Sequence, residues 1–367
     1  MKLMVQPGDG VMPTVKAINK AKHRVDILIF RFDRSEIEKA LVNAVNRGVF
    51  VHALIAYTNR GGEKNLRKLE MRLLSEGVTV ARTADDLTRY HGKMMVIDRR
   101  ELHLLAFNFT SLDIDHSRSF GLVTGNKKLV AEAVKLFDAD IKRQPYSAGH
   151  PNFVVSPVNA RKQLSAFLHG AKKQILIWDP EVSDPGMIRI LEERARAGVE
   201  VQIIGRLTRR NPKLQARKLC AIRLHTRTIV RDGVDAFIGS QSLRELELNA
   251  RREIGVIFRD RKLVAQLMKT FAEDWESAGR PSAECVVQVP DVEPAAKVAK
   301  RVAKAVVKEL PAVAPVVEVI VKEVVGDKNG VGLDHQQVEE AVKEAIKDAV
   351  RDVVEVAVEQ NGIGLHK

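Results

Sequence analysis

The residue types best suited to chemistry gather in one short segment, residues 91–98, with the sequence HGKMMVID. His91, Lys93 and Asp98 follow the spacing H-x-K-x4-D, and the apolar run between them predicts a buried strand. Residues two apart on a strand point to the same face, so His91 and Lys93 would face one ligand. A nucleophile or proton carrier beside a fixed positive charge is suited to an anionic substrate.

A second segment, HTRTIVRD, repeats this pattern far along the chain. Here His225, Arg227 and Asp232 follow the spacing H-x-R-x4-D, so an arginine stands where the first segment has a lysine. Further polar residues follow the histidines at fixed distances: Asn108 lies 17 residues after His91, Ser242 lies 17 after His225 in the turn Gly239-Ser240-Gln241-Ser242, and Glu253 lies 28 after His225.

The surrounding sequence indicates an internal duplication. The apolar strands at 26–32 and 174–179 correspond at an offset of 150 residues, and so do Arg47-Gly48-Val49 and Ala197-Gly198-Val199. The histidines are offset by only 134 residues, so the second half is expected to be shorter between its second strand and its histidine. Strands alternate with helical patterns, which is typical of βαβ units. We therefore predict a duplicated α/β fold: two halves with mixed or parallel sheets, flanked by helices around a pseudo-two-fold axis.

The repeated sequence landmarks and a change of composition divide the chain into three segments. Residues 1–145 and 151–280 are expected to form the two repeats, and 281–367 an Ala/Val/Lys/Glu-rich linker with a helical C-terminal extension. Within that extension, 334–360 predicts a helix with a stripe of small apolar residues, which is suited to a homodimer contact or to docking on the body.

The charge of the chain favours an anionic partner. The net charge is +13, yet residues 291–367 carry 11 basic and 14 acidic side chains, so the excess of positive charge lies in the repeats. The two cysteines have no metal-ligand spacing, and we expect neither a structural metal nor a cofactor. No apolar run reaches the roughly 20 residues of a membrane span, which favours a cytoplasmic protein, in peripheral contact with the inner membrane if its substrate is a lipid.

Two histidine segments of this kind, each followed by a G-S-x-N-like turn, in a duplicated α/β chain, resemble the phospholipase D superfamily. The PGDG opening, the IFRFD strand and the RGV segment also resemble its bacterial cardiolipin-synthase-like members. The resemblance covers roughly residues 5–275 and implies that Asp98 and Asp232 lie away from the phosphate in a structural role. The chain departs from the family pattern at Arg227, at Leu105-Ala106 in place of Gly-Ser, and at Ser242 in place of asparagine.

Displacement at a phosphodiester needs a nucleophile, an acid for the leaving oxygen and cations for the non-bridging oxygens. One histidine would form a phosphohistidine while the other protonates the leaving group and then activates water or an alcohol. Lys93 and Arg227 would neutralise the phosphoryl oxygens. Further hydrogen bonds could come from Asn108, Ser240 and Ser242.

Glu253 could orient either histidine. If it acts across the pseudo-dyad it orients His91 and favours His91 as the nucleophile; if it acts within its own half, it favours His225. We expect the first arrangement, because the first segment keeps its lysine. Ser119 occupies the equivalent position after His91, and Asp115 or His116 could replace the carboxylate that is missing there.

Three functions fit these residues. The first is phosphodiester hydrolysis or phosphatidyl transfer on phospholipids, and the second is a nuclease on the same scaffold. The third is a catalytically decayed protein that binds phosphate or lipid. The basic run 206–227 contains no aromatic residues, which argues against base stacking and favours a phospholipid headgroup over nucleic acid.

Overall fold

The computed structural model describes residues 1–57, 63–208 and 212–278, all within one compact unit, Met1–Val287. The predicted extension at 281–367, with its dimer helix at 334–360, lies outside the described residues. The proposed repeat boundaries stay a prediction.

The first half is built on a mixed sheet in the order β1-β8-β7-β6-β2-β3-β4. Its elements are β1 (Lys2–Gln6), α1 (Met12–Lys20), β2 (Arg24–Ile29), α2 (Ser35–Asn46), β3 (Phe50–Ile55), α3 (Glu63–Ser75), β4 (Thr79–Arg82), β5 (Arg89–Tyr90), β6 (Met94–Ile97), β7 (Glu101–Leu105), α4 (Ser111–Asp115), β8 (Ser117–Thr124) and α5 (Lys127–Lys142). The pairs β2·β3 and β3·β4 are parallel, and the other neighbours in this order are antiparallel.

The second half has a sheet in the order β12-β11-β10-β14-β15-β17-β9. Its elements are β9 (Phe153–Val155), α6 (Ala160–His169), β10 (Gln174–Val182), α7 (Pro185–Arg196), β11 (Glu200–Leu207), β12 (Gln215–Arg217), β13 (Arg223–Leu224), β14 (Arg227–Arg231), β15 (Asp235–Gly239), α8 (Glu245–Asn249), β16 (Arg251–Arg252), β17 (Ile254–Phe258) and α9 (Arg261–Ser277).

The two halves repeat one topology. In both sheets the three strands at one end, β2·β3·β4 or β10·β11·β12, are parallel, and the next four are antiparallel. The predicted duplicated α/β fold is therefore confirmed. Among the described residues α3 has no counterpart in the second half, where β11 and β12 are joined by residues 208–214 alone. This shorter connection accounts for the smaller offset between the histidines.

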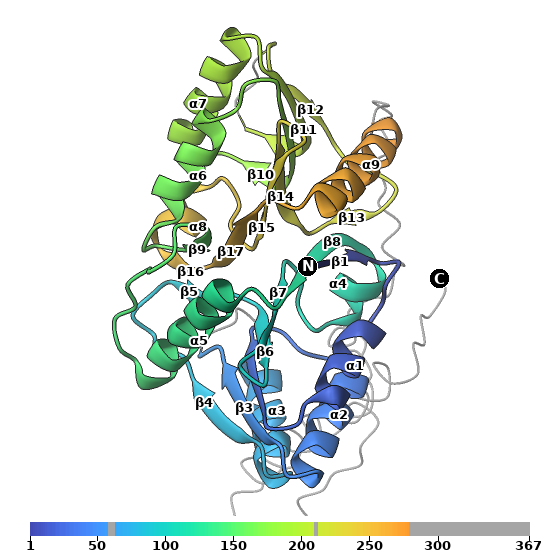
Figure 1. The fold of residues 1–367 in the computed structure, drawn as a ribbon, viewed down its shortest axis with the longest axis vertical. Coiled ribbons are helices and arrows are strands. Elements are labelled where there is room, and N and C mark those ends of the chain that lie inside the picture. The colour runs from blue at the N-terminus through green and yellow to red at the C-terminus, as the bar shows by residue number, and fades with distance from the viewer. Residues whose placement is uncertain (58–62, 209–211, 279–367) are drawn as a thin grey trace, which may run out of the picture. The chain divides into compact units, whose positions relative to one another are not determined.

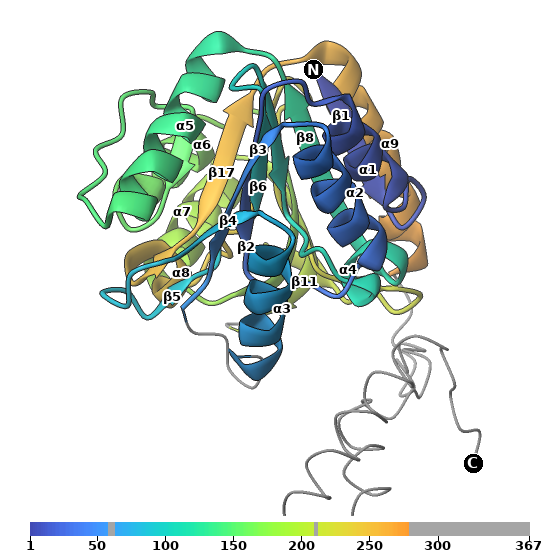
Figure 2. The ribbon, with the colours of Figure 1, turned by 90° about the horizontal axis from the view of Figure 1, so that it is seen from below.

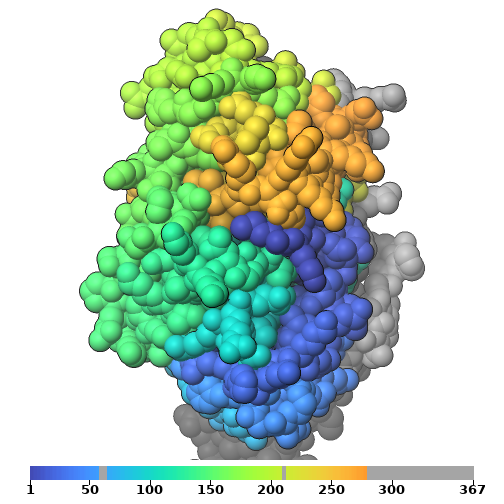
Figure 3. Space-filling view, in the orientation of Figure 1, coloured from blue at the N-terminus to red at the C-terminus, as the bar shows by residue number. Residues whose placement is uncertain are grey.

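Three apolar clusters hold the layers together. The central cluster contains residues of both sheets, such as Phe120 and Trp178, together with Phe271 of α9, so the halves share one core. A second cluster lies under α1, α2 and α3, and a third under α6 and α7. The ribbon views show these helices on the outer faces of the two sheets (Figures 1 and 2). In the space-filling view the orange C-terminal part of the described chain lies directly against the blue N-terminal part (Figure 3).

A polar contact fixes the two halves at this core. Asp274 on α9 accepts hydrogen bonds from the indole Nε1 of Trp178, at 2.9 Å, and from the guanidinium of Arg118 on β8, at 2.9–3.1 Å. Asp274 is buried, and a buried carboxylate is costly unless such donors surround it. The bonds from Arg118 join the first half to the second, and the bond from Trp178 fixes α9 to its own sheet.

Two short strands cross from one half to the other. The strand β5, just before His91, pairs in parallel with β16, and β13, just before His225, pairs in parallel with β8 (Figure 1). Each histidine also uses its backbone N–H across the boundary: His91 donates to the Arg252 oxygen at 2.8 Å, and His225 donates to the Arg118 oxygen at 3.1 Å. The functional segments are therefore held by the opposite half.

This crossing corrects the expectation that the histidines lie on buried strands. The strand β6 begins at Met94 and β14 begins at Arg227, so His91, Lys93 and His225 precede the strands. The physical reason is that the backbone N–H groups of residues 91–92 and 225–226 donate to the other half instead of to a neighbouring strand of their own sheet.

Candidate active site

The site is centred on His91, which lies against a carboxylate from the other half. Its Nδ1 is 2.9 and 3.0 Å from the two carboxylate oxygens of Glu253, and the edge of the Phe30 ring packs at 4.5 Å between centroids. Glu253 is fully buried and His91 is 7% exposed. The carboxylate thus acts across the pseudo-dyad, which is the arrangement expected from the sequence.

Lys93 and Arg227 take equivalent places beside the two histidines. Lys93 Nζ donates to the backbone oxygen of His91 at 2.7 Å, and Arg227 Nη1 donates to the backbone oxygen of His225 at 2.7 Å. Lys93 Nζ also lies 3.0 Å from His91 Nε2, while Arg227 Nε donates to Ser242 Oγ at 3.1 Å. The arginine therefore reproduces the lysine's backbone contact and adds a bond to the turn that follows β15.

Burial governs the protonation of this centre. Burial and the Lys93 cation hold the pKa of His91 well below its usual value, which leaves a neutral ring at neutral pH. If Nδ1 carries the proton toward Glu253, the Nε2 lone pair is available as a nucleophile. Burial also lowers the pKa of Lys93 to about 7 and raises that of Glu253 above its usual range.

Asp98 and Asp232 lie at the far end of the two histidine segments and bind backbone only. Asp98 accepts from the N–H groups of residues 22–24 at 2.7–3.2 Å, and Asp232 accepts from those of residues 172–174 at 2.7–3.0 Å. Both have left-handed backbones, with φ of 51° and 54°, which aspartate tolerates better than most residues. Each closes the turn after its strand and ties that turn to the start of the neighbouring strand, β2 or β10.

His225 is paired with a residue that the sequence reasoning missed. Its Nε2 lies 3.5 Å from Asp113 Oδ2, and Asp113 also accepts from Arg223 Nη1 at 2.7 Å and from Asn108 Nδ2 at 2.6 Å. Burial opposes ionisation of Asp113, but His225, Arg223 and the backbone N–H of Asn108 outweigh it and hold its pKa well below the usual value. Burial lowers the pKa of His225 well below 6.5, although Asp113 acts in the opposite direction.

The expectation that Asp115 or His116 serves this histidine is wrong. The Asp115 carboxylate forms an ion pair with Arg34 and accepts from Ser111 Oγ, and the His116 side chain is exposed. The helix α4 is five residues long and turns Asp113, not Asp115, toward the second half. A usable signal was present: Asp113 lies 22 residues after His91, and Glu247 lies 22 after His225.

The remaining predicted residues lie close to the same centre. Ser240 Oγ accepts the backbone N–H of Ile254 at 3.1 Å, beside Glu253, and it also favours ionisation of Glu253. Asn108 gives one amide hydrogen to Asp113, while its Oδ1 is buried without a hydrogen-bond partner. Ser119, which replaces a carboxylate, is buried with its hydroxyl likewise unpartnered.

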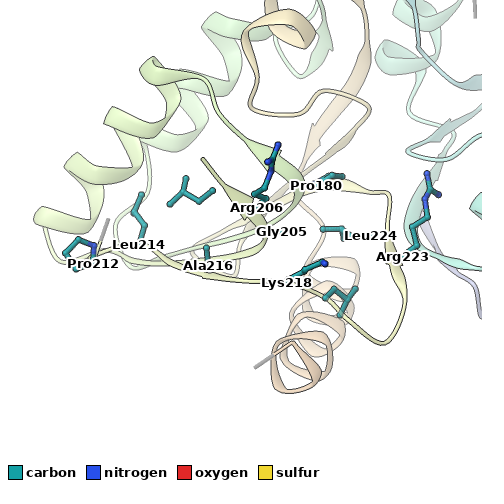
Figure 4. Close-up of a pocket in the computed structure, with 11 residues that line it drawn as sticks. Pro180, Gly205, Arg206, Pro212, Leu214, Ala216, Lys218, Arg223 and Leu224 are labelled. Carbon is teal, nitrogen blue, oxygen red and sulfur yellow. The ribbon is translucent and has the colours of Figure 1, made fainter. Parts of the chain in front are cut away.

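A groove of about 940 Å³ begins beside this centre on the second half. Most of its lining is apolar: Pro180, Leu207, Pro212, Leu214, Leu219 and Leu224. Cations also border it, namely Arg206, Lys218 and Arg223. Figure 4 shows Arg223 at one end and Pro212 with Leu214 at the other. Since Arg223 also binds Asp113, the groove and the histidine centre share a residue.

Comparison with known proteins agrees with the duplication. A family model described as "Cardiolipin synthase, PLD-like domain" matches residues 14–141 and 164–275, which together are more than half of the chain. The chain belongs to the phospholipase D superfamily. The two matched ranges fall one in each half of the duplicated fold, and each contains one histidine segment.

Several relatives of this superfamily member are named for phosphoryl chemistry. Polyphosphate kinase 1 of Chlorobaculum tepidum is 27% identical over 225 residues, covering 56% of this chain and 32% of that protein. Polyphosphate kinase of Mycolicibacterium gilvum is 25% identical over 309 residues, covering 74% of this chain and 39% of that protein. The chain thus spans about a third of the length of these curated relatives.

Solved structures share the fold. The polyphosphate kinase from Porphyromonas gingivalis superposes with a TM-score of 0.63 at 20% identity, covering 75% of this chain and 50% of that one. The phosphatidylserine synthase of Haemophilus influenzae Rd KW20 superposes with a TM-score of 0.58 at 11% identity, covering 76% of this chain and 86% of that one. None of the helices in the described ranges is both long and apolar enough to cross a membrane.

Proposed function

We propose that this phospholipase D superfamily protein cleaves or exchanges a phosphodiester bond of a phospholipid through a phosphohistidine on His91. The observation that carries the proposal is the contact of His91 Nδ1 with Glu253, at 2.9 Å. A carboxylate behind one ring nitrogen fixes the tautomer and orientation of the ring, so that the other nitrogen is presented to the substrate.

In the first step Nε2 of His91 attacks phosphorus, and the bond to the leaving oxygen breaks. His225 donates a proton to that oxygen, and the Nδ1 proton of His91 stays in the hydrogen bond to Glu253. Lys93 and Arg227 stabilise the charge that develops on the non-bridging oxygens.

In the second step the phosphohistidine is the electrophile. Water or an alcohol attacks phosphorus, His225 takes the proton of the attacking oxygen, and the bond to His91 Nε2 breaks. Both histidines then regain their starting protonation states. Hydrolysis and transfer differ only in which oxygen nucleophile reaches the intermediate.

The groove beside Arg223 supports a phospholipid. An apolar floor with a cationic border suits a molecule that joins an acyl chain to a phosphate, and a fully polar polyanion would leave that floor exposed to water. Such a substrate would also bring the protein into peripheral contact with a membrane, through its cationic surface.

A second candidate, transfer of a phosphoryl group from polyphosphate, is favoured by the names of the curated relatives. It uses the same two histidines and cations, since a phosphoanhydride also presents phosphorus with a leaving oxygen. The difference lies in the substrate that occupies the groove.

The test is to trap the covalent intermediate. The wild-type protein and the His225→Ala variant are mixed with bis-p-nitrophenyl phosphate, quenched in alkali, and mapped by mass spectrometry. We expect an alkali-stable, acid-labile adduct on His91, more abundant in His225→Ala because the second step lacks its base. His91→Ala should give no adduct, and His116→Ala, which removes an exposed histidine, should match the wild type. If no adduct forms in any variant, the proposal fails.

Substrates are then compared with the same protein. Turnover of phosphatidylglycerol vesicles in preference to polyphosphate and plasmid DNA would support the phospholipid assignment. Preferential turnover of polyphosphate would support the second candidate, and cleavage of DNA would instead indicate a nuclease.

A further inference from the structure

Asp113 lies beside His225, on the side of the histidine centre where the expected carboxylate is missing. The position that gives His91 its carboxylate, Glu253, is occupied on the His225 side by Ser119, which cannot carry a charge. Asp113 reaches His225 from α4 of the opposite half and lies 3.5 Å from Nε2. It is 2% exposed, so its interaction with the ring is little screened by water.

The setting of Asp113 keeps it ionised and in place. Thr110 Oγ1 accepts from its backbone N–H at the start of α4, and Arg223 and Asn108 donate to its carboxylate at 2.6–2.8 Å. These donors favour the charged form strongly. An aspartate that remains ionised at neutral pH has no proton to supply, and its low pKa makes it a weak base.

The other charged groups around His225 all oppose its protonation. Arg227 from β14, Arg223 from β13 and Lys93 from the first half each disfavour the imidazolium, as does burial. Asp113 is the group that favours it. Without this anion, every remaining influence on His225 would disfavour the imidazolium, and its pKa would fall further below the usual value.

We propose that Asp113 is a positioning residue that favours the protonated form of His225, so that His225 can act as the acid of the first step. The inference rests on the proposed function. Asp113 would support His225 as Glu253 supports His91, although Asp113 lies 22 residues after the histidine of its own half and Glu253 lies 28 after its own. The separation of 3.5 Å is long for an N–H···O bond, whose usual length is about 2.9 Å. The carboxylate therefore stabilises the charge while the Nε2 hydrogen stays available to the substrate.

This role predicts a dependence on the leaving group. An alkoxide, such as the oxygen that departs from phosphatidylglycerol, needs a proton as it leaves, whereas p-nitrophenolate is stable without one. The protein is therefore compared as wild type and Asp113→Asn, with a short-chain phosphatidylglycerol and with bis-p-nitrophenyl phosphate. Asparagine keeps the shape of aspartate and its acceptor oxygen but removes the charge.

We expect the alkyl-to-aryl ratio of kcat/KM to fall about tenfold to a hundredfold in Asp113→Asn, with the aryl rate changed less than about threefold. The decline of the alkyl rate with rising pH should also move to lower pH, because His225 loses its proton more readily. The ratio is measured within one protein preparation, so a misfolded fraction lowers both rates equally and leaves the ratio unchanged. Asp115→Asn, on the same helix but paired with Arg34, is the matched control and should keep the wild-type ratio.

Two outcomes would overturn the inference. Equal losses on both substrates would make Asp113 a structural residue, and an unchanged ratio with unchanged rates would give it no role. In either case an adduct on His91 would leave the proposed function standing, while absence of the adduct in the wild type would remove the proposed function itself.

Discussion

The first and second halves share one sheet topology but have different side chains at the centre. The shared features are those the backbone needs: an aspartate that closes the turn after each histidine strand, a cation that donates to the histidine's own carbonyl at 2.7 Å, and a two-residue strand that crosses to the other half. The features that differ are those around the ring nitrogens. The two halves are therefore alike in the contacts that hold the histidine segments in place. They differ in the side chains that contact the histidine rings.

This asymmetry fits the two different roles that the proposed reaction gives to the histidines. His91 has a buried carboxylate at Nδ1, while His225 has Asp113 at Nε2 and a buried Nδ1 without a hydrogen-bond partner. A two-step displacement needs one nucleophile and one proton carrier, so two identical sites would not improve it. The difference between the halves agrees with one site made from both.

The largest difference between the halves should appear when the carboxylate that contacts His91 is replaced. Glu253→Gln keeps the shape of the side chain but loses the charge that fixes the His91 tautomer, and we expect adduct formation to slow roughly a thousandfold. Ser119→Ala, at the equivalent position of the first half, should slow it less than about threefold. Rapid-quench kinetics measure both. Equal effects at the two positions would contradict the asymmetry.

A second test compares the two cations. Lys93, with a pKa of about 7, should lose its charge as the pH rises through 7, and Arg227 occupies the equivalent place in the other half. Binding of sulfate, which does not titrate in this range, should therefore weaken by roughly tenfold between pH 6 and pH 8. Inhibition of bis-p-nitrophenyl phosphate cleavage measures it.

The Lys93→Met variant is the control for this pH dependence. It should bind sulfate weakly at both pH values, with a much smaller change between them. A pH dependence as steep as that of the wild type would show that another group is responsible.

The smallest effect is expected where the halves are alike. Asp98→Ala and Asp232→Ala each remove acceptors for three backbone N–H groups and place alanine in a left-handed conformation, so each should lower the free energy of unfolding by about 2–3 kcal/mol. Urea unfolding followed by circular dichroism gives both values. A large loss at one position and none at the other would show that the structural repeat is not energetically equivalent.

Much of this architecture could be predicted from local patterns. The duplication, the α/β class and the superfamily follow from strand spacing and from two histidine segments, because these features repeat within short windows of sequence. The contact between His91 and Glu253 was expected only as one of two arrangements. Spacing along the chain cannot tell a carboxylate that acts within its half from one that acts across the boundary.

The incorrect strand placement and the missed aspartate both concern residues at the boundary between the two halves. His91 and Lys93 were placed on a strand because an apolar run follows them, but the backbone N–H groups of residues 91 and 92 donate to Arg252 of the other half, and the strand begins only at Met94. Asp113 was missed because its partner, His225, lies more than a hundred residues away, and the direction of a short helix decides which aspartate faces it. Long-range packing determines both, and neither leaves a periodic signal.

The crossed strands β5·β16 and β13·β8 also bear on how the protein reaches its active form. The residues that meet at His91 and Glu253 are separated by 162 positions in the chain, so the loop between them must close before either side chain is oriented. A first half that folds alone would have its histidine beside no carboxylate and its crossing strand without a partner. The proposed phosphate chemistry would therefore require that the second half has docked on the first.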